Sequence, residues 1–389
     1  MENIEIPIPD FSSYNSKILN THIMYGLVES LLRGGVRDVR VFPRGEGYKI
    51  QADFTWPQLL EGMKSALQDM LAMHFATGHS VEIKMKSTKL RTILSDVSFC
   101  GGVLLDPPQN IQRYPRELQA ILRYLERANP YSETEKILEE MKSSKSFIPD
   151  GRSKHLVVLE QLDPTISKWI GFYSYEEGGR LSRLEYALAW IGLHYYSTIS
   201  KVLRKSNQRV IIAQYPPLES IKTWELLLIK DIATGIGDDK EEYWRIGVEY
   251  GLFRKLLDVS LPPSVEGVPG LSTFGVVLYA QERSGAKGWR IFRQLEFPRL
   301  WDFVSHLKMV ALYDLVKFVR TLKGLECSKD NKKAIDDVLA QFGRGIYSAI
   351  VFNEVNDLYV AIRGLRRLGY PVPHKVMNAI IEYVLGDRA

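Results

Sequence analysis

Cysteine is scarce in this sequence, and signals that would place a protein outside the cytoplasm are missing. Only Cys100 and Cys327 occur, far apart, which excludes a disulfide framework and leaves no cysteine pair with metal-ligand spacing. The opening residues MENIEIPIPD have neither the basic start nor the apolar stretch of a secretory signal peptide. No apolar run approaches the roughly 20 residues of a membrane-spanning helix. We therefore expect a cytoplasmic protein in a reducing compartment.

Familiar catalytic signatures are also missing. The sequence has no GxxxxGK[ST] phosphate-binding loop, no strand-linked GxGxxG, no GxSxG turn and no HExxH motif. The densest acids are Asp238, Asp239, Glu241 and Glu242. A helix separates neighbouring side chains by about 100°, so these four cannot all converge on a pair of metal ions. We expect no enzymatic activity, no metal and no cofactor. A metal-dependent nuclease using Asp238, Asp239 or Glu242 is the alternative.

Positive charge is present in mild excess. Lysine and arginine number 51 against 46 acidic residues, which permits a polyanionic partner without requiring one. The hydrophobic fraction of 45% and the aromatic fraction of 11% are those of a folded globular protein. A chain of 389 residues is long enough for two or three domains.

The stretch from Asn20 to Phe54 has the clearest local pattern. Ile23, Leu27 and Leu31 share one face of a predicted helix, which Gly34-Gly35 should end. Two strand-like runs, 36–42 and 48–54, flank a turn at 43–47 and predict a β-hairpin. Five basic residues lie on or near the hairpin: Arg33, Arg37, Arg40, Arg44 and Lys49. A stiff hairpin with a basic tip suits nucleic-acid recognition, and an ordinary solvated hairpin is the alternative.

The remaining pattern predicts an α+β protein, with an N-terminal α/β domain that carries the hairpin and a mainly helical C-terminal half. We expect domains over 1–105, 106–295 and 296–389. The other predicted elements are a helix from Trp56 to Gly78, strands at 81–85, 90–99, 155–162 and 210–213, helices at 115–128, 132–142, 181–202, 220–232 and 240–256, a hairpin at 274–293, and helices from 299 to 385 with breaks near 326–330, 343–345 and 369–373.

Further basic clusters recur along the chain. Arg363, Arg366 and Arg367 are three and four residues apart, so a helix would present them together, opposite Ala361 and Leu365. Such a triplet fits a row of phosphates, and a solvated helix face is the alternative. The other clusters that we predict to bind nucleic acid are Lys84 with Lys86, and Arg204 with Lys205 and Arg209.

Two helical stretches carry a family resemblance. The run THIMYGLVESLL at 21–32 and the predicted helix at 181–196 resemble the large subunit of the archaeal type I-A CRISPR interference complex, known as Cascade. The resemblance implies a non-catalytic subunit that helps to sense the protospacer-adjacent motif and holds the opening target DNA. It also implies three kinds of partner, namely crRNA-guided effector subunits, a small subunit beside the helical C-terminal part, and a separate helicase–nuclease that cleaves.

The leading hypothesis is therefore a DNA- and RNA-binding large subunit that acts in antiviral defence. Its basic side chains would contact mainly phosphates, which position nucleic acid without specifying sequence. A nuclease and a helical protein-interaction scaffold are the alternatives.

Overall fold

The computed structural model describes residues 3–7, 17–44, 47–82, 122, 154–155, 180–181, 183–204, 207–234, 243–258, 273–283, 286–328 and 330–386. The chain divides into two compact units. The first unit comprises Met1–Val210, Ser220–Thr234 and Leu278–Phe292, and the second comprises Ile211–Glu219, Gly235–Val277 and Arg293–Ala389. The domain boundaries at 105 and 295 stay a prediction.

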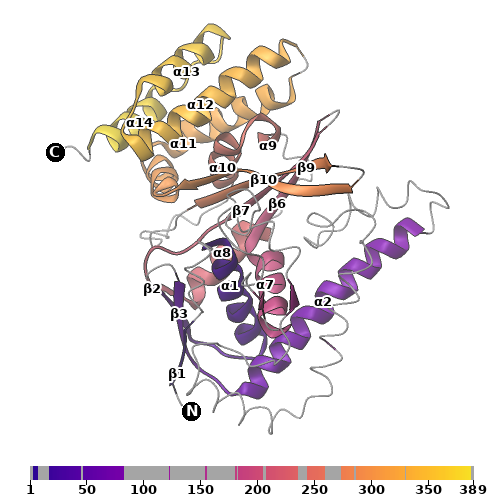
Figure 1. Ribbon diagram of the computed structural model, residues 1–389. Coiled ribbons are helices and arrows are strands. Elements are labelled where there is room, and N and C mark those ends of the chain that lie inside the picture. The colour runs from indigo at the N-terminus through magenta and orange to yellow at the C-terminus, as the bar shows by residue number, and fades with distance from the viewer. Residues whose placement is uncertain are drawn as a thin grey trace, which may run out of the picture. The chain divides into compact units, whose positions relative to one another are not determined.

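The first unit is built on a four-stranded sheet of order β1-β3-β2-β8. Its strands are β1 (Asn3–Pro7), β2 (Val39–Arg44), β3 (Gly47–Asp53) and β8 (Ile221–Lys222), and each neighbouring pair is antiparallel. Since β1 and β2 are both antiparallel to β3, they are parallel to each other, with helix α1 (Lys17–Arg33) between them in sequence (Figure 1). Val39, Val41, Ile50 and Ala52 alternate along β2 and β3 and are buried, which places the core on one face of the sheet.

Helix α1 ends as its sequence predicts. Gly35 has a φ of 84°, in the left-handed region that favours glycine. Its N–H donates to the carbonyl of Leu32 at 3.1 Å, and the N–H of Val36 donates to Leu31 at 3.1 Å. This pairing satisfies the last carbonyls of the helix and turns the chain into β2.

Helix α1 packs against α7 (Arg183–Tyr196) and α2 (Trp56–Glu82). A Cβ on Gly26 of α1 would overlap the carbonyl oxygen of Leu188 in α7, and a Cβ on Gly192 of α7 would overlap that of His22 in α1. The two backbones therefore touch at reciprocal positions, which only glycine permits. Helix α8 (Thr223–Thr234) also packs on α7.

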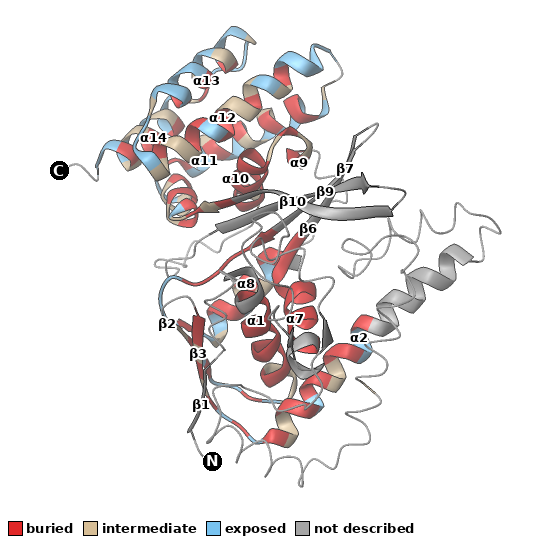
Figure 2. Cartoon of the chain, viewed as in Figure 1, coloured by how far each residue is buried: buried red, intermediate tan, exposed pale blue. Residues whose placement is uncertain are grey.

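The second unit contains six described helices: α9 (Tyr243–Ile246), α10 (Val248–Asp258), α11 (Leu300–Cys327), α12 (Lys332–Phe352), α13 (Asn356–Arg367) and α14 (His374–Gly386). Phe342 of α12 packs edge-on against Phe253 of α10 and Phe318 of α11, with ring centroids 5.9 Å apart in both pairs. Buried residues line the inward faces of these helices, while α13 is largely exposed on its other face (Figure 2).

Two further sheets complete the strands. One has the order β10-β9-β7-β6 and consists of β6 (Ser197–Arg204), β7 (Asn207–Gln214), β9 (Thr273–Arg283) and β10 (Ala286–Phe297). The other pairs β4 (Lys154–His155) with β5 (Arg180–Leu181). Within the described residues, no helix is both long and apolar enough to cross a membrane.

The predicted fold class is confirmed, since an N-terminal sheet with its hairpin precedes a helical C-terminal half. The hairpin β9–β10 and the break at 369–373 are also as predicted. The predicted strand at 90–99 and the paired helices at 115–142 lie outside the described residues, apart from Leu122.

Several predicted boundaries are wrong. Helix α2 continues through Gly78 to Glu82, so the strand expected from 81 begins inside a helix; a single helical glycine costs only about 1 kcal/mol, which the helix absorbs. Helix α7 stops at Tyr196, and residues expected to extend it form β6. The β-branched Thr198, Ile199 and Val202 favour this change to strand.

The predicted helices at 220–232 and 240–256 each divide. The first begins as strand β8 before α8, and the second is two helices separated by Gly247. In contrast, the break expected at 343–345 does not occur, because α12 runs through both glycines. A Cβ on Gly343 would collide with the backbone of Tyr250, and one on Gly345 with the backbone of Leu358. These glycines permit close helix packing and do not end the helix.

Candidate nucleic-acid interface

The basic hairpin is tighter than its sequence suggests and lies in the middle of a sheet. Arg44 pairs with Gly47 across the ladder, so only two residues connect β2 to β3. The outer edge of β2 pairs with β8, and the outer edge of β3 pairs with β1. The hairpin is therefore held on both sides, and its side chains project from a sheet and not from a free arm.

One face of this sheet is polar and basic. Side chains alternate between faces along a strand, so the residues that follow the buried ones point the other way. Arg40, Arg44 and Lys222 are exposed, whereas Phe42, Lys49 and Gln51 are partly exposed. Asp53, the last residue of β3, is exposed on the same face and adds one carboxylate at its far end. We call the following residues the outer sheet face: Arg40, Phe42, Arg44, Lys49, Gln51 and Lys222.

Three charges of the outer sheet face, those of Arg40, Arg44 and Lys222, are weakly compensated. Arg40 lies 3.5 Å from Asp38, but the two side chains are 50% and 72% exposed, so the pair contributes little. In the described parts of the chain, no carboxylate forms an ion pair with Arg44 or Lys222. Arg37 is exposed and precedes β2. The outer sheet face thus presents positive charge to solvent.

Thr223, the first residue of α8, fixes this part of the sheet. Its hydroxyl accepts from the N–H of Val39 at 2.8 Å and donates to the carbonyl of Arg37 at 3.0 Å. These bonds join residues almost half the chain apart and bring Lys222 beside Arg40.

Arg33 has a different environment from the rest of its predicted cluster. Its side chain is 22% exposed, donates to Glu29 at 2.7 Å and pairs with Asp69. Burial alone would lower its pKa, but the hydrogen bonds to Glu29 and Asp69 outweigh burial and raise it. Glu29 also accepts from Lys230 at 2.7 Å. Arg33 therefore cross-links helices and is not part of the outer sheet face.

Tyr196 and His194 of α7 are buried in the same region, near Glu29 and Arg33. Tyr196 is buried, donates to Glu29 at 3.3 Å and stacks on Tyr25 with centroids 4.5 Å apart, so it is a core residue. His194 is buried beside Arg33 and Lys230; burial, with help from these two charges, lowers its pKa to about 3. It is neutral at physiological pH.

A second basic surface lies on α13 in the second unit. Arg363, Arg366 and Arg367 are exposed, while Leu358, Ala361 and Leu365 on the opposite face are buried. None of the three arginines forms an ion pair within the residues that the structure describes. Positive charge in the last turn of a helix also offsets the helix dipole, so Arg366 and Arg367 could stabilise α13 without binding a ligand.

The other predicted binding residues are not tested. Lys84, Lys86 and Lys205 lie outside the described residues, as do the acids at 238–242. Arg204 and Arg209 lie on β6 and β7, but their side chains are outside the description. Their binding roles stay predictions.

Comparison with known proteins decides the family. The family description "CRISPR-associated protein (Cas_Csa4)" matches residues 9–386. The chain belongs to the Csa4 family. A relative in Methanocaldococcus jannaschii, CRISPR-associated protein Cas8a2/Csa4, is 30% identical over 324 residues, which cover 79% of this chain and 77% of the relative. The predicted resemblance to the type I-A CRISPR large subunit is confirmed.

Three features of this Csa4-family chain are not among the predictions made from the sequence. Lys222 was expected in a helix, because a two-residue strand leaves no periodic signal. Phe42 and Gln51 become candidate binding residues only because the sheet places them beside basic residues on the neighbouring strand. The third feature is on α11, where apolar residues occupy two opposite faces, a signal that the sequence does contain.

On α11, one apolar face is buried and the other is exposed. Ala311, Leu315, Phe318, Leu322 and Leu325 are buried. Met309, Leu312, Tyr313 and Val316 are exposed, with Met309 before and the other three after a kink at Ala311; Met309 and Tyr313 are 73% and 74% exposed. We call these four residues the α11 stripe. An exposed apolar patch of this kind is typical of a protein-interaction surface.

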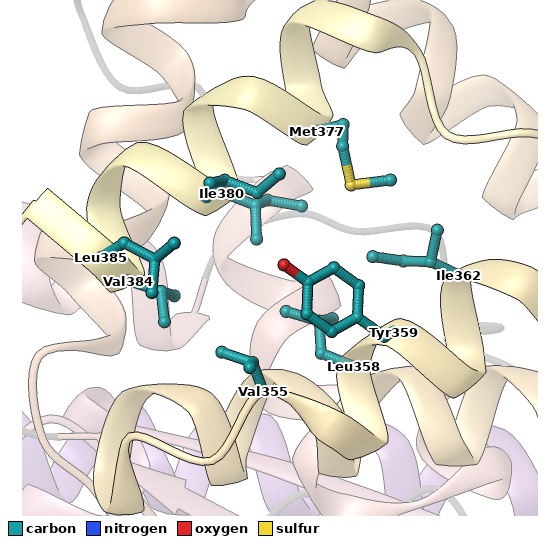
Figure 3. A pocket seen from close by; sticks show the side chains of 9 residues that line it. Val355, Leu358, Tyr359, Ile362, Met377, Ile380, Val384 and Leu385 are labelled. Atoms are coloured by element: carbon teal, nitrogen blue, oxygen red, sulfur yellow. The ribbon is translucent and has the colours of Figure 1, made fainter.

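A small apolar pocket lies between α13 and α14 (Figure 3). Val355, Leu358 and Ile362 approach from α13 and the residue before it, and Met377 and Ile380 approach from α14. Tyr359 extends from α13 toward α14, and its ring lines the pocket (Figure 3). The remaining lining side chains are aliphatic or methionine and offer no acid or base.

Proposed function

We propose that this protein is a non-catalytic, nucleic-acid-binding large subunit of its effector complex, and that it contributes to protospacer-adjacent motif sensing and target DNA binding. The observation that carries the proposal is the row of three exposed, unpaired arginines on α13. Guanidinium groups bind phosphates at two points, and such contacts supply most of the affinity of proteins for nucleic acids.

Motif sensing requires a contact to base edges in addition to phosphates. Arg44 is the candidate, because it ends β2 next to the hairpin connection and has no carboxylate partner in the described sheet. Its planar fork can bind guanine at two points, which lysine cannot reproduce. We assign cleavage to another component, since the sequence contains no recognisable catalytic motif.

The proposed partners are target DNA, crRNA-guided effector subunits, a small subunit and a helicase–nuclease. Membership of a CRISPR effector family implies other subunits. The α11 stripe supports a protein contact in the second unit, because a helix that is apolar on two faces normally buries both.

Replacing Arg363, Arg366 and Arg367 together by alanine is expected to weaken target DNA binding alike for all sequences. It should also reduce the slope of log affinity against log salt by about 0.9 for each lost phosphate contact on duplex DNA. The measurement is a binding titration of the assembled complex at several salt concentrations.

The DNA recovered after incubation with the lone protein and Mg²⁺ is expected to be uncut.

The matched control replaces Arg320, Arg344 and Lys375 by alanine, which removes the same charge from exposed positions on α11, α12 and α14. This variant should retain the slope of the wild type. An equal change in both variants would assign the effect to net charge and not to α13. Cleavage by the lone protein would support the nuclease alternative.

Replacing Leu312 and Tyr313 by serine is expected to reduce the amount of small subunit that co-purifies with this protein by severalfold. These exposed side chains contribute little to the fold, so the variant should unfold within about 0.5 kcal/mol of the wild type. The control is Val360→Ser, at a half-exposed apolar residue of α13. Equal co-purification of all three proteins would contradict a role for the α11 stripe.

A further inference from the structure

The outer sheet face has an aromatic residue at its centre. Phe42 has Arg40 and Arg44 as neighbours two residues away on the same strand, and both share its face. Its ladder partner on β3 is Lys49. Phe42 is partly exposed, and no ring in the described part of the molecule stacks on it or meets it edge-on.

Groups that bind phosphates and base edges surround this ring on three strands. Arg40 lies between Gln51 of β3 and Lys222 of β8, its partners on either side. Arginine and lysine bind phosphates, and the amide of glutamine both donates and accepts hydrogen bonds. On β1 the next position of this row is Glu5, so the cations gather on β2, β3 and β8, around the aromatic ring.

This arrangement suits a separated strand better than a duplex. In a duplex the base faces are stacked on one another and cannot reach an aromatic side chain, whereas a single strand can lay a base on a ring. Four strands about 4.8 Å apart are wider than the roughly 12 Å major groove, so this sheet can lie under a strand but does not enter a groove as a two-stranded ribbon would.

We propose that the outer sheet face binds a single-stranded polynucleotide, with one base stacked on Phe42 and the backbone held by Arg40 and Lys222. This inference rests on the proposed nucleic-acid-binding function and adds the form of the ligand. Arg44, at the end of β2, stays available for the base-edge contact proposed above. The strand is either RNA or separated DNA, which share the same base faces and phosphates.

The test is fluorescence anisotropy of the full-length protein with a labelled single-stranded RNA, a DNA of the same sequence, and the corresponding duplex. Phe42→Ala should weaken single-strand binding roughly 5- to 150-fold, the usual loss on removing one stacking side chain. Duplex binding should be almost unchanged, and Phe42→Trp should restore single-strand binding. A loss confined to RNA or to DNA identifies the strand.

Two further variants test the phosphate contact and control for the loss of an exposed phenylalanine. Lys222→Ala changes an exposed side chain and should lower the single-strand salt slope by about 0.7. Phe352→Ala removes an exposed phenylalanine of the second unit and should leave the affinity for all three ligands unchanged. Equal losses on duplex and single strands, or none with Phe42→Ala, would overturn the stacking site alone. A wild-type protein that binds none of the three ligands would overturn the nucleic-acid function itself.

Discussion

Replacing Glu326 by alanine is expected to lower the free energy of unfolding of the second unit by about 3–5 kcal/mol, because it leaves a buried arginine without its carboxylate. Arg254 of α10 is fully buried, and its Nε donates to Glu326 of α11 at 2.6 Å. Tyr250 donates its hydroxyl to the same carboxylate oxygen at 2.6 Å. One carboxylate thus satisfies two buried donors.

The positive charge of Arg254 persists despite burial. Burial would lower the pKa of Arg254, but hydrogen bonding and the charge of Glu326 outweigh it and raise the pKa, so the guanidinium stays protonated. Burial and the negative charge of Glu326 raise the pKa of Tyr250, which therefore stays a donor. Arg254 Nη1 lies 3.2 Å from Asp258, a pair that is only partly buried and cannot replace Glu326.

Urea unfolding of the full-length protein measures the effect. Glu326→Gln preserves the shape and should lose less than Glu326→Ala, and Arg254→Met combined with Glu326→Leu should recover part of the loss by removing both charges. Asp337→Ala, at an exposed carboxylate of α12, is the control and should stay within about 0.5 kcal/mol. A loss below about 1 kcal/mol for Glu326→Ala would contradict the need for this carboxylate.

The second large effect is expected from Gly26→Ala in α1, which should cost about 3 kcal/mol, the upper end of the range for overpacking. The added methyl group would meet the backbone carbonyl of Leu188 in α7, and backbone cannot rotate away as a flexible side chain can. The two helices must then separate. Because α1 packs more extensively against α7 than against any other described element of the first unit, the separation loosens its core.

Gly192→Ala should cost a similar amount, and the double variant less than the sum, because one methyl group already separates the helices. The matched control is Gly324→Ala in α11, where a Cβ would meet nothing, and it should stabilise the protein by about 0.5–1 kcal/mol. Thermal or urea unfolding measures all four proteins. Unchanged stability of Gly26→Ala would show that α1 and α7 do not touch through their backbones.

Local patterns in the sequence were sufficient for much of the fold. Apolar spacing and Gly34-Gly35 located α1, and alternation located β2 and β3. The same reasoning placed Arg363, Arg366 and Arg367 on the exposed face of α13. These successes share a cause, because a helix stripe, a strand alternation and a glycine cap depend only on residues a few positions apart.

The sequence by itself therefore determined the fold class, the hairpin, the amphipathic α13 and the family resemblance. Only the tertiary structure decided that Arg33 serves Glu29 and Asp69, that Lys222 joins Arg40 and Phe42 on one face, and that α12 continues through its glycines. Each of these outcomes depends on a contact between residues distant in the chain, such as the hydrogen bond of Thr223 to Val39 across 184 positions. Side-chain pairing and close backbone approach are determined when helices and strands pack together, and the periodicity of nearby residues in the sequence does not predict them.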